Sequence, residues 1–369
     1  MNNTLKKIGM FEATAFIIIT IINYTMLNTP KEIISKTASG AWLNMIFIIA
    51  LTIIFVIFIT KLLKKFPFMD IVDISEFLGG KVFKIIVSTI FVIALFFTLI
   101  YNLQNFTNAL QVIFLQDSPM IYILLFFLVG IIFANRLGFN AIVRVNLVIT
   151  GLLLLSVLII FFAPIKDYTF ENLFPILGNG ISETFFEGLG NIFVFSGLFY
   201  LLLLPPLLED QKSLPKIGVI AVVISGVYLL LSLLNLLMLF RFIIDSEEIV
   251  SLFLSTRIIS FGEFFQRVDA LFTFLWTFSY LSYLSIGTFF VTYIIKKITN
   301  ISNQNVLTYG IALLIFSVTL LAQNFLATSK ALSPYVNTVT IFALIVVPTI
   351  VIVLASMKSR YKSFKNNIT

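Results

Sequence analysis

Residues 21–30 read IINYTMLNTP, and this stretch decides how the first apolar segment of the chain can fold. An uninterrupted apolar run leads into it, and then Asn23, Tyr24 and Thr25 bring polar side chains where a membrane-spanning helix would continue. Inside a bilayer, non-helical backbone persists only where protein buries it or where it lines a cavity. The stretch therefore predicts a helix break beside a buried site.

The composition identifies the solvent as lipid. Of 369 residues, 60% are hydrophobic and 11% are charged, and the mean hydropathy is +1.09. A helix needs about 20 apolar residues to cross a bilayer, and runs of that length recur along the chain. Strands of a membrane barrel would instead show short alternating segments. The sequence predicts an all-α membrane protein.

We expect one integral membrane domain over residues 1–369, with ten transmembrane helices. Residues 10–163 would form a first repeat of five helices and residues 189–357 a second one. A basic tail, 358–369, would follow on the cytoplasmic side. The expected spans are 10–28, 41–63, 82–110, 119–135, 142–163, 189–206, 216–242, 267–295, 305–326 and 335–357.

The distribution of basic residues sets the expected orientation. If both termini are cytoplasmic, most of the 24 Lys and Arg residues fall in inner segments, as the positive-inside rule requires. The net charge of +7 then reflects topology and attraction to the anionic lipid bilayer. No basic stripe with interleaved aromatic residues is present, so nucleic acid is not an expected partner.

The chain contains no cysteine and no histidine. Thiol chemistry, imidazole metal ligands and every histidine-dependent catalytic triad are thereby excluded. We expect a protein that is not an enzyme and that has no catalytic residues, metal or cofactor.

A second interruption lies in the sixth expected span, where Ser196 and Gly197 fall inside an apolar run that ends at Pro205 and Pro206. The first and sixth helices would each open a five-helix half. Broken helices at matching positions of two halves indicate a midplane binding site in a 5+5 inverted repeat. The alternative is that glycine and proline are simply tolerated in membrane helices.

The expected site carries no charge at its centre, because we find no Asp, Glu, Lys or Arg in the central part of any span. A zwitterionic amino acid can be held without counter-charges, by free backbone groups at helix breaks and by polar side chains. For Ser279, Ser282 and Tyr283 the alternative is a role in helix–helix packing. The candidate ligand-binding residues are Asn23, Tyr24, Thr25, Ser196, Gly197, Tyr200, Ser279, Ser282 and Tyr283.

Four stretches carry a resemblance to a known family. They are SGAWL (39–43), KKFPFMDIVDISEFLGG (64–80), NLFPILGNG (172–180) and FGEFFQRVDALFTFLW (261–276). In this order and spacing they resemble the B subunits of spore germinant receptors, a branch of the amino acid–polyamine–organocation transporter superfamily. Gly197 matches the glycine that this family has in its sixth span, whereas Asn23, Tyr24 and Thr25 occupy a break that is often glycine-rich in relatives.

The resemblance implies a nutrient sensor in the inner spore membrane that binds a small ligand such as an amino acid and triggers germination. It also implies partners, an A-type subunit and a C-type lipoprotein subunit. The alternative function is that of a working amino acid secondary transporter or permease, because carbonyl-coordinated sodium would leave the same uncharged pattern.

Overall fold

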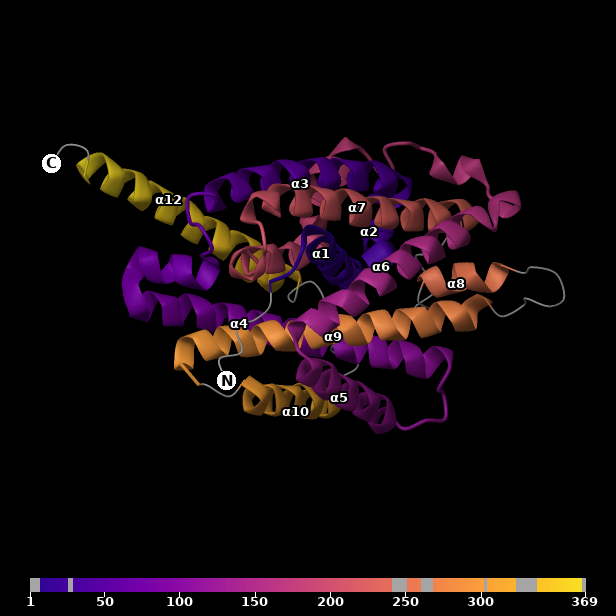
Figure 1. Ribbon diagram of the computed structural model, residues 1–369. Coiled ribbons are helices and arrows are strands. Elements are labelled where there is room, and N and C mark those ends of the chain that lie inside the picture. Colours follow the sequence, from indigo (N-terminus) through magenta and orange to yellow (C-terminus); the bar gives the residue numbers. More distant parts are fainter. Residues whose placement is uncertain are drawn as a thin grey trace.

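The computed structural model describes residues 7–25, 29–240, 251–259, 268–301, 304–322 and 337–366. Within these ranges the chain is helices and connecting loops, and the one strand-like feature is an isolated bridge between Ile8 and Leu208. The predicted all-α class is confirmed. The helices pack as one bundle, in which helices from the first and second halves of the sequence lie side by side (Figure 1).

Nine helical segments among the described residues are long and apolar enough to cross a membrane, and Met10–Asn23 is a shorter apolar helix. The elements used below are α1 (Met10–Thr25), α2 (Thr29–Thr37), α3 (Ala41–Leu63), α4 (Ile71–Ile113), α5 (Met120–Leu137), α6 (Phe139–Phe162), η4 (Ser182–Phe186), η5 (Glu187–Leu202), η6 (Pro205–Leu207), α7 (Leu214–Leu239), α8 (Ser251–Ile258), α9 (Val268–Thr299), α10 (Gln304–Ala322), η10 (Phe342–Val346) and α12 (Val347–Asn366).

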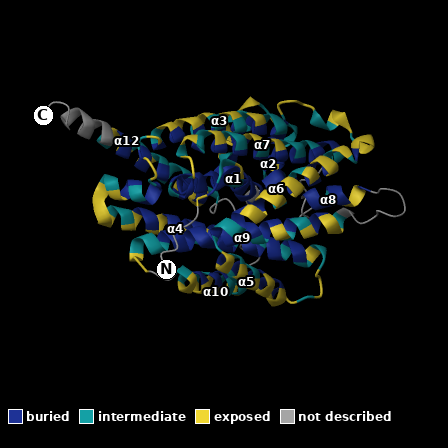
Figure 2. Ribbon diagram, viewed as in Figure 1, coloured by how far each residue is buried: buried dark blue, intermediate teal, exposed yellow. Residues whose placement is uncertain are grey.

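Helices α1 and α9 form the centre of the bundle. Helix α1 packs against α6, α7, η5 and α9, and α9 also packs against α4, α5, α6 and α10. In Figure 1, α3 and α7 lie side by side on one side of this pair, and α5 and α10 lie together on the other. The outer faces expose apolar side chains, as lipid-facing surfaces do (Figure 2).

Helix α4 consists of two pieces joined at a kink. Asp70 caps its first turn by accepting hydrogen bonds from the backbone N–H groups of Val72 and Asp73. Gly80 then adopts φ +75° and ψ −170°, which a residue with a side chain rarely adopts. The first piece is the acidic, glycine-terminated stretch, and the expected span 82–110 is the second piece. A short helical hairpin results (Figure 1).

The two expected helix breaks differ in local structure. Helix α1 ends at Thr25 and α2 begins at Thr29, with Pro30 as its second residue. Element η5 is a 3₁₀ helix of 16 residues, and η6, with two prolines, follows it. Runs of 3₁₀ helix longer than a few residues are uncommon and often mark hinges. The ten-span count, the two-repeat division and the broken helices stay predictions.

Candidate functional site

The end of α1 is joined directly to the middle of α9. Asn23 donates a hydrogen bond from Nδ2 to Oγ of Ser279, at 2.7 Å, and shares that donor group with the carbonyl of Ile19, at 3.0 Å. Both Asn23 and Ser279 are fully buried. The structure thus brings together one candidate from the first expected span and one from the eighth.

Gly197 on η5 lies against the backbone of α1. A Cβ added at this position would be 2.9 Å from the backbone nitrogen of Ile21 and 2.9 Å from the carbonyl oxygen of Thr20. Thr20 in turn points its Oγ1 at the carbonyl of Gly197, at 3.5 Å, while donating to its own helix at Ile17. Only glycine permits this approach of η5 to α1 without movement of backbone.

Aromatic rings close one side of the same contact. Tyr200 is 4% exposed, and its ring centroid lies 5.9 Å from that of Phe16 and 5.3 Å from that of Phe290. Tyr200 is one turn beyond Gly197 on η5, and the neighbouring Ser196 is also buried. The η5 candidates Gly197 and Tyr200 therefore both contact α1.

Two α9 candidates are bonded to other helices. Ser282 donates to Oδ1 of Asn146 on α6, and the hydroxyl of Tyr283 accepts a 3.5 Å hydrogen bond from Asn102 on α4. These contacts fit the role in helix–helix packing that the sequence left open. Tyr24 and Thr25 are the last two residues of α1, and their side chains lie outside the described part of the structure.

The contacts leave buried polar atoms without a hydrogen bond. Oδ1 of Asn23 and Nδ2 of Asn146 are both buried and have no partner in the described part of the chain. An orphaned buried acceptor or donor costs about 1–3 kcal/mol. Other buried polar atoms of the described residues share this state, among them Oδ1 of Asn135, Asn191 and Asn235.

Sequence reasoning missed Thr20 and Asn146. Thr20 is three residues before Asn23 and shares its helix face, a signal that the spacing rule for helices could have supplied. Asn146 lies 136 residues from Ser282, and nothing in the local sequence connects the two. The signal for Asn146 is weaker, an amide inside an apolar run.

A second missed feature is an ionic cluster at the end of the bundle where α9 finishes. Lys297 binds Asp70 at 2.6 Å and Asp73 at 2.7 Å, and Tyr293 donates to Asp70 at 2.7 Å. Asp70 is fully buried, and this burial raises the pKa of its carboxyl while the Lys297 ammonium opposes the rise. We call Asp70, Asp73, Tyr293 and Lys297 the ionic cluster, and its end of the bundle the basic end.

The segment just before α1 is fastened at the same end. Ile8 donates its N–H to the carbonyl of Leu207 and accepts from the N–H of Glu209. Lys358 of α12 donates to the carbonyls of Phe77 and Leu78, which lie in the last turn before the kink of α4. A cation at a helix C-terminus is favourable. The basic end is thus held together by segments from both ends of the sequence.

At the far end, two of the stretches that carried the family resemblance meet. Gly178 has φ +55°, and a Cβ added there would be 2.0 Å from the carbonyl oxygen of Thr37. Ser39 donates to the carbonyl of Pro175, at 2.7 Å. Residues 172–180 are therefore clamped on the corner between α2 and α3. We call this contact, 172–180 on 37–40, the outer latch.

Of the charged residues at and before the start of α9, Glu263 and Arg267 lie outside the described residues, and Asp269 is in the first turn of α9. Arg257 on α8 lies over the ring of Phe253, at 4.9 Å. Among the described residues, no group of three acidic, His or Cys side chains could hold a metal ion.

Two comparisons with known proteins both match this chain to spore germination proteins. A family model described as Spore germination protein matches residues 7–326. The chain is also similar to Spore germination protein KB of Bacillus subtilis (strain 168), with 24% identity over 359 residues, 91% of this chain and 90% of the relative. Together with the apolar helices, the match makes this a multi-pass membrane protein.

Proposed function

The chain belongs to the spore germination protein family, and from this premise we propose that it is the nutrient-sensing membrane subunit of a spore germinant receptor. In this proposal it lies in the inner spore membrane with both termini on the spore-core side. Its partners are an A-type and a C-type receptor subunit. Its similarity to Spore germination protein KB over nine-tenths of both chains supports a role for the whole chain in germination.

The ligand site of this proposal lies where α1, η5 and α9 meet. The observation that carries it is the pair of contacts at the end of α1, Asn23 on Ser279 and Gly197 on the backbone of Thr20 and Ile21. The side chains of Asn23 and Ser279 are polar, uncharged and fully buried in an apolar bundle. Burying them is costly unless a partner satisfies them.

An amino acid fits this set of groups. Oδ1 of Asn23 is the acceptor for an ammonium group. The hydroxyls of Ser279 and Ser196 are donors for the carboxylate. The aromatic wall of Phe16, Tyr200 and Phe290 then limits the size of the ligand's side chain.

The described arrangement is closed to solvent, because Asn23, Ser279, Ser196 and Tyr200 are all buried. A nutrient enters only if the bundle opens at one end. A ligand shifts such an equilibrium only when it binds one arrangement better than the other. We propose that the nutrient stabilises the closed arrangement, in which η5 and α9 are drawn onto α1, and that this is the signal passed to the partners.

A working transporter is the second candidate function. The observation that favours it is that the site lies between two closures, the outer latch at one end and the ionic cluster at the other. Alternating access requires closures on both sides of a binding site. The 5+5 inverted repeat with broken first and sixth helices belongs to this proposal as well.

One experiment separates the two functions. The purified protein is reconstituted into liposomes and supplied with each radiolabelled amino acid on the outside, with and without a sodium or proton gradient. A sensor binds its amino acid without accumulating it in the lumen. Accumulation that depends on a gradient identifies a transporter, and absence of binding by folded protein contradicts both functions.

A further inference from the structure

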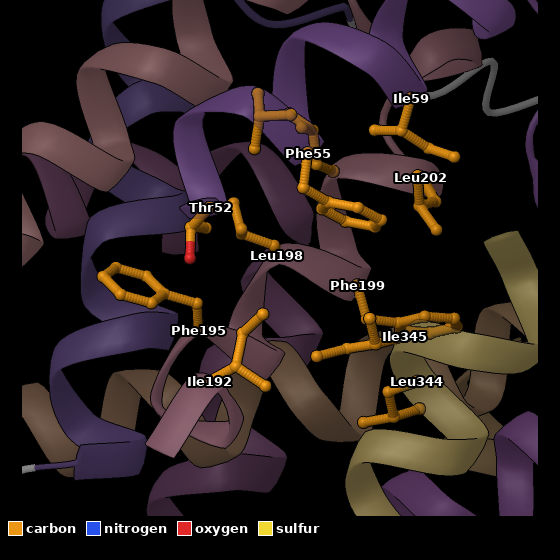
Figure 3. Close-up of a pocket in the computed structure, with 12 residues that line it drawn as sticks. Thr52, Phe55, Ile59, Ile192, Phe195, Leu198, Phe199, Leu202, Leu344 and Ile345 are labelled. Atoms are coloured by element: carbon orange, nitrogen blue, oxygen red, sulfur yellow. The ribbon is translucent and has the colours of Figure 1, made fainter. Parts of the chain in front are cut away.

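An apolar crevice lies behind η5, on the side that faces away from α1. Its walls come from α3, η5 and η10, and its volume is about 20 Å³. Figure 3 shows side chains of all three elements around it, among them Phe55, Phe195 and Leu344. The crevice is separate from the proposed nutrient site, because none of its lining residues is a candidate ligand-binding residue.

The 3₁₀ geometry of η5 gives this helix two different faces. A 3₁₀ helix has three residues per turn, so side chains three apart stand in one row. Gly197 and Tyr200 belong to the row that meets α1. The crevice is lined by residues of the other two rows, Ile192, Phe195, Leu198 and Leu201 in one and Phe199 and Leu202 in the other. One helix thus presents its glycine row to the proposed nutrient site and large apolar side chains of its other two rows to the crevice.

The crevice offers nothing to a polar ligand. Its one polar side chain is Thr52, whose hydroxyl already donates to the carbonyl of Ile48, at 2.7 Å. An apolar cavity of this kind does not hold water. An amino acid, with two charged groups, would therefore lose its hydration there without compensation.

The position of the crevice decides which apolar molecule can reach it. Thr52 is at the middle of α3, and Leu344 and Ile345 lie well inside the span Asn337–Lys358. Both walls also face lipid, since Phe58 of α3 and Phe342 of η10 are exposed. At this depth the surrounding solvent is the hydrocarbon of lipid tails. The narrow volume excludes a partner helix, which is about 10 Å wide.

We propose that the crevice is a lipid site, which takes the end of one acyl chain of a membrane phospholipid. An empty crevice would leave the side chains that line it without contacts on one face, and a tail restores those contacts. The end of the acyl chain then lies against the side of η5 that faces away from α1. It fills the space into which Phe195 and Leu198 would otherwise move when η5 withdraws from Thr20.

The test uses the purified full chain in nanodiscs made with a phosphatidylcholine that carries a photoreactive diazirine at the end of one acyl chain. After illumination, the labelled residues are mapped by mass spectrometry. We expect adducts on Leu198, Phe199 and Leu201 of η5, in addition to those on lipid-facing residues of α3. Labelling that is confined to lipid-facing residues overturns the proposal.

Two variants fill the crevice from different walls, Ile192→Trp on η5 and Ile345→Trp on η10. The matched control, Ile350→Trp, adds the same ring to a lipid-facing position of α12. All are checked for a single symmetric peak in gel filtration. Loss of the η5 adducts in whichever filling variant folds, with retention in the control, supports the lipid site. Unchanged labelling of η5 in a folded filling variant overturns it.

The same labelling is repeated in native membranes. Adducts on η5 there support the proposal, whereas their absence would mean that another protein fills the crevice and would overturn it. No step of this test uses a nutrient, so its outcome does not depend on the proposed sensing function.

Discussion

Asn23 and Ser279 are hydrogen-bonded to each other across 256 residues of sequence, with both side chains fully buried. Their contact fixes the end of α1 against the middle of α9, the two helices at the centre of the bundle. It also leaves Oδ1 of Asn23 without a partner. In the proposed site, this acceptor is the group that the nutrient would satisfy.

The first prediction concerns this contact. Ser279→Ala removes the partner of Asn23 and a donor for the ligand carboxylate. Loss of one such hydrogen bond costs about 1.5 kcal/mol, so the affinity for the nutrient should fall about tenfold or more. The affinity is measured by equilibrium binding of the radiolabelled nutrient to protein in nanodiscs.

The matched control for that change is Ser285→Ala on the same helix. Ser285 donates only to Leu281 of its own helix, at 2.7 Å, and takes no part in the proposed site through its hydroxyl. Its replacement should leave the affinity within about twofold of the wild type, because no ligand contact is lost. Equal losses for Ser279→Ala and Ser285→Ala would place the nutrient elsewhere.

The second prediction concerns the approach of η5 to α1. Gly197→Ala forces a methyl group to within 2.9 Å of the α1 backbone. Such overpacking costs about 1–3 kcal/mol, and here it pushes the two walls of the proposed site apart. The expected result is a lower Tm together with a loss of nutrient-induced stabilisation, both measured by thermal unfolding in detergent.

Gly190→Ala is the control for Gly197→Ala, since it lies on the same helix and a Cβ there would have open space. This variant should keep the wild-type nutrient response. If Gly197→Ala responded to the nutrient as Gly190→Ala does, the close contact with α1 would have no functional role.

The third prediction concerns the ionic cluster. Lys297→Met leaves two carboxylates, one of them fully buried, without a counter-charge. Removing one partner of a buried ion pair costs about 3–5 kcal/mol, so this variant should unfold at a clearly lower temperature. Lys296→Met should have a Tm close to that of the wild type, because the Lys296 side chain makes no ion pair or hydrogen bond within the described part of the chain, and its carbonyl, which accepts from Asn300, is kept.

A double variant shows whether charge is the cause. Asp70→Asn combined with Lys297→Met removes the buried charge together with its partner, and it should recover part of the lost Tm. A Tm as low as that of the single Lys297→Met variant would contradict the ionic explanation and point to the packing of the lysine stem.

The fourth prediction concerns the outer latch. Gly178→Ala both strains a positive φ and drives a methyl group against the carbonyl of Thr37. Gly138→Ala strains a positive φ of +91° in open space, so it shows the backbone cost alone, which is about 1–3 kcal/mol. We therefore expect the Gly178 variant to open the latch and the Gly138 variant to leave it closed.

Latch opening can be read from thiol chemistry, because the chain has no cysteine of its own. Thr184 is fully buried under the latch and donates to the carbonyl of Leu177. In a Thr184→Cys background, a water-soluble maleimide should react faster when Gly178→Ala is also present. The same reaction rate with Gly178→Ala and Gly138→Ala would exclude a role for the contact with Thr37.

The fold was largely predictable because lipid imposes one simple rule. Apolar runs of the required length gave the helices, and the residues that interrupt them gave Asn23 and Gly197 as candidates. Predictions within one helix, such as Tyr200 one turn from Gly197, needed only helical spacing. The kink at Gly80 was not predicted, although glycine there permits a conformation that other residues avoid.

The contacts between helices were not predictable from one sequence. Nothing near Asp70 indicates that Lys297, 227 residues away, supplies its counter-charge. The same holds for Asn146 with Ser282 and for the clamp of residues 172–180 on 37–40. The 3₁₀ geometry of η5 was missed as well, because an apolar run with glycine reads equally as an α-helix.

The most direct test of the proposed nutrient site is a thermal-stabilisation screen of the purified protein in nanodiscs against the twenty amino acids. The proposal predicts that at least one amino acid raises the Tm of the wild type and of Gly190→Leu, and that it leaves the Tm of folded Gly197→Leu unchanged. An amino acid that stabilises Gly197→Leu as much as the wild type would show that nutrient binding does not occur between α1, η5 and α9.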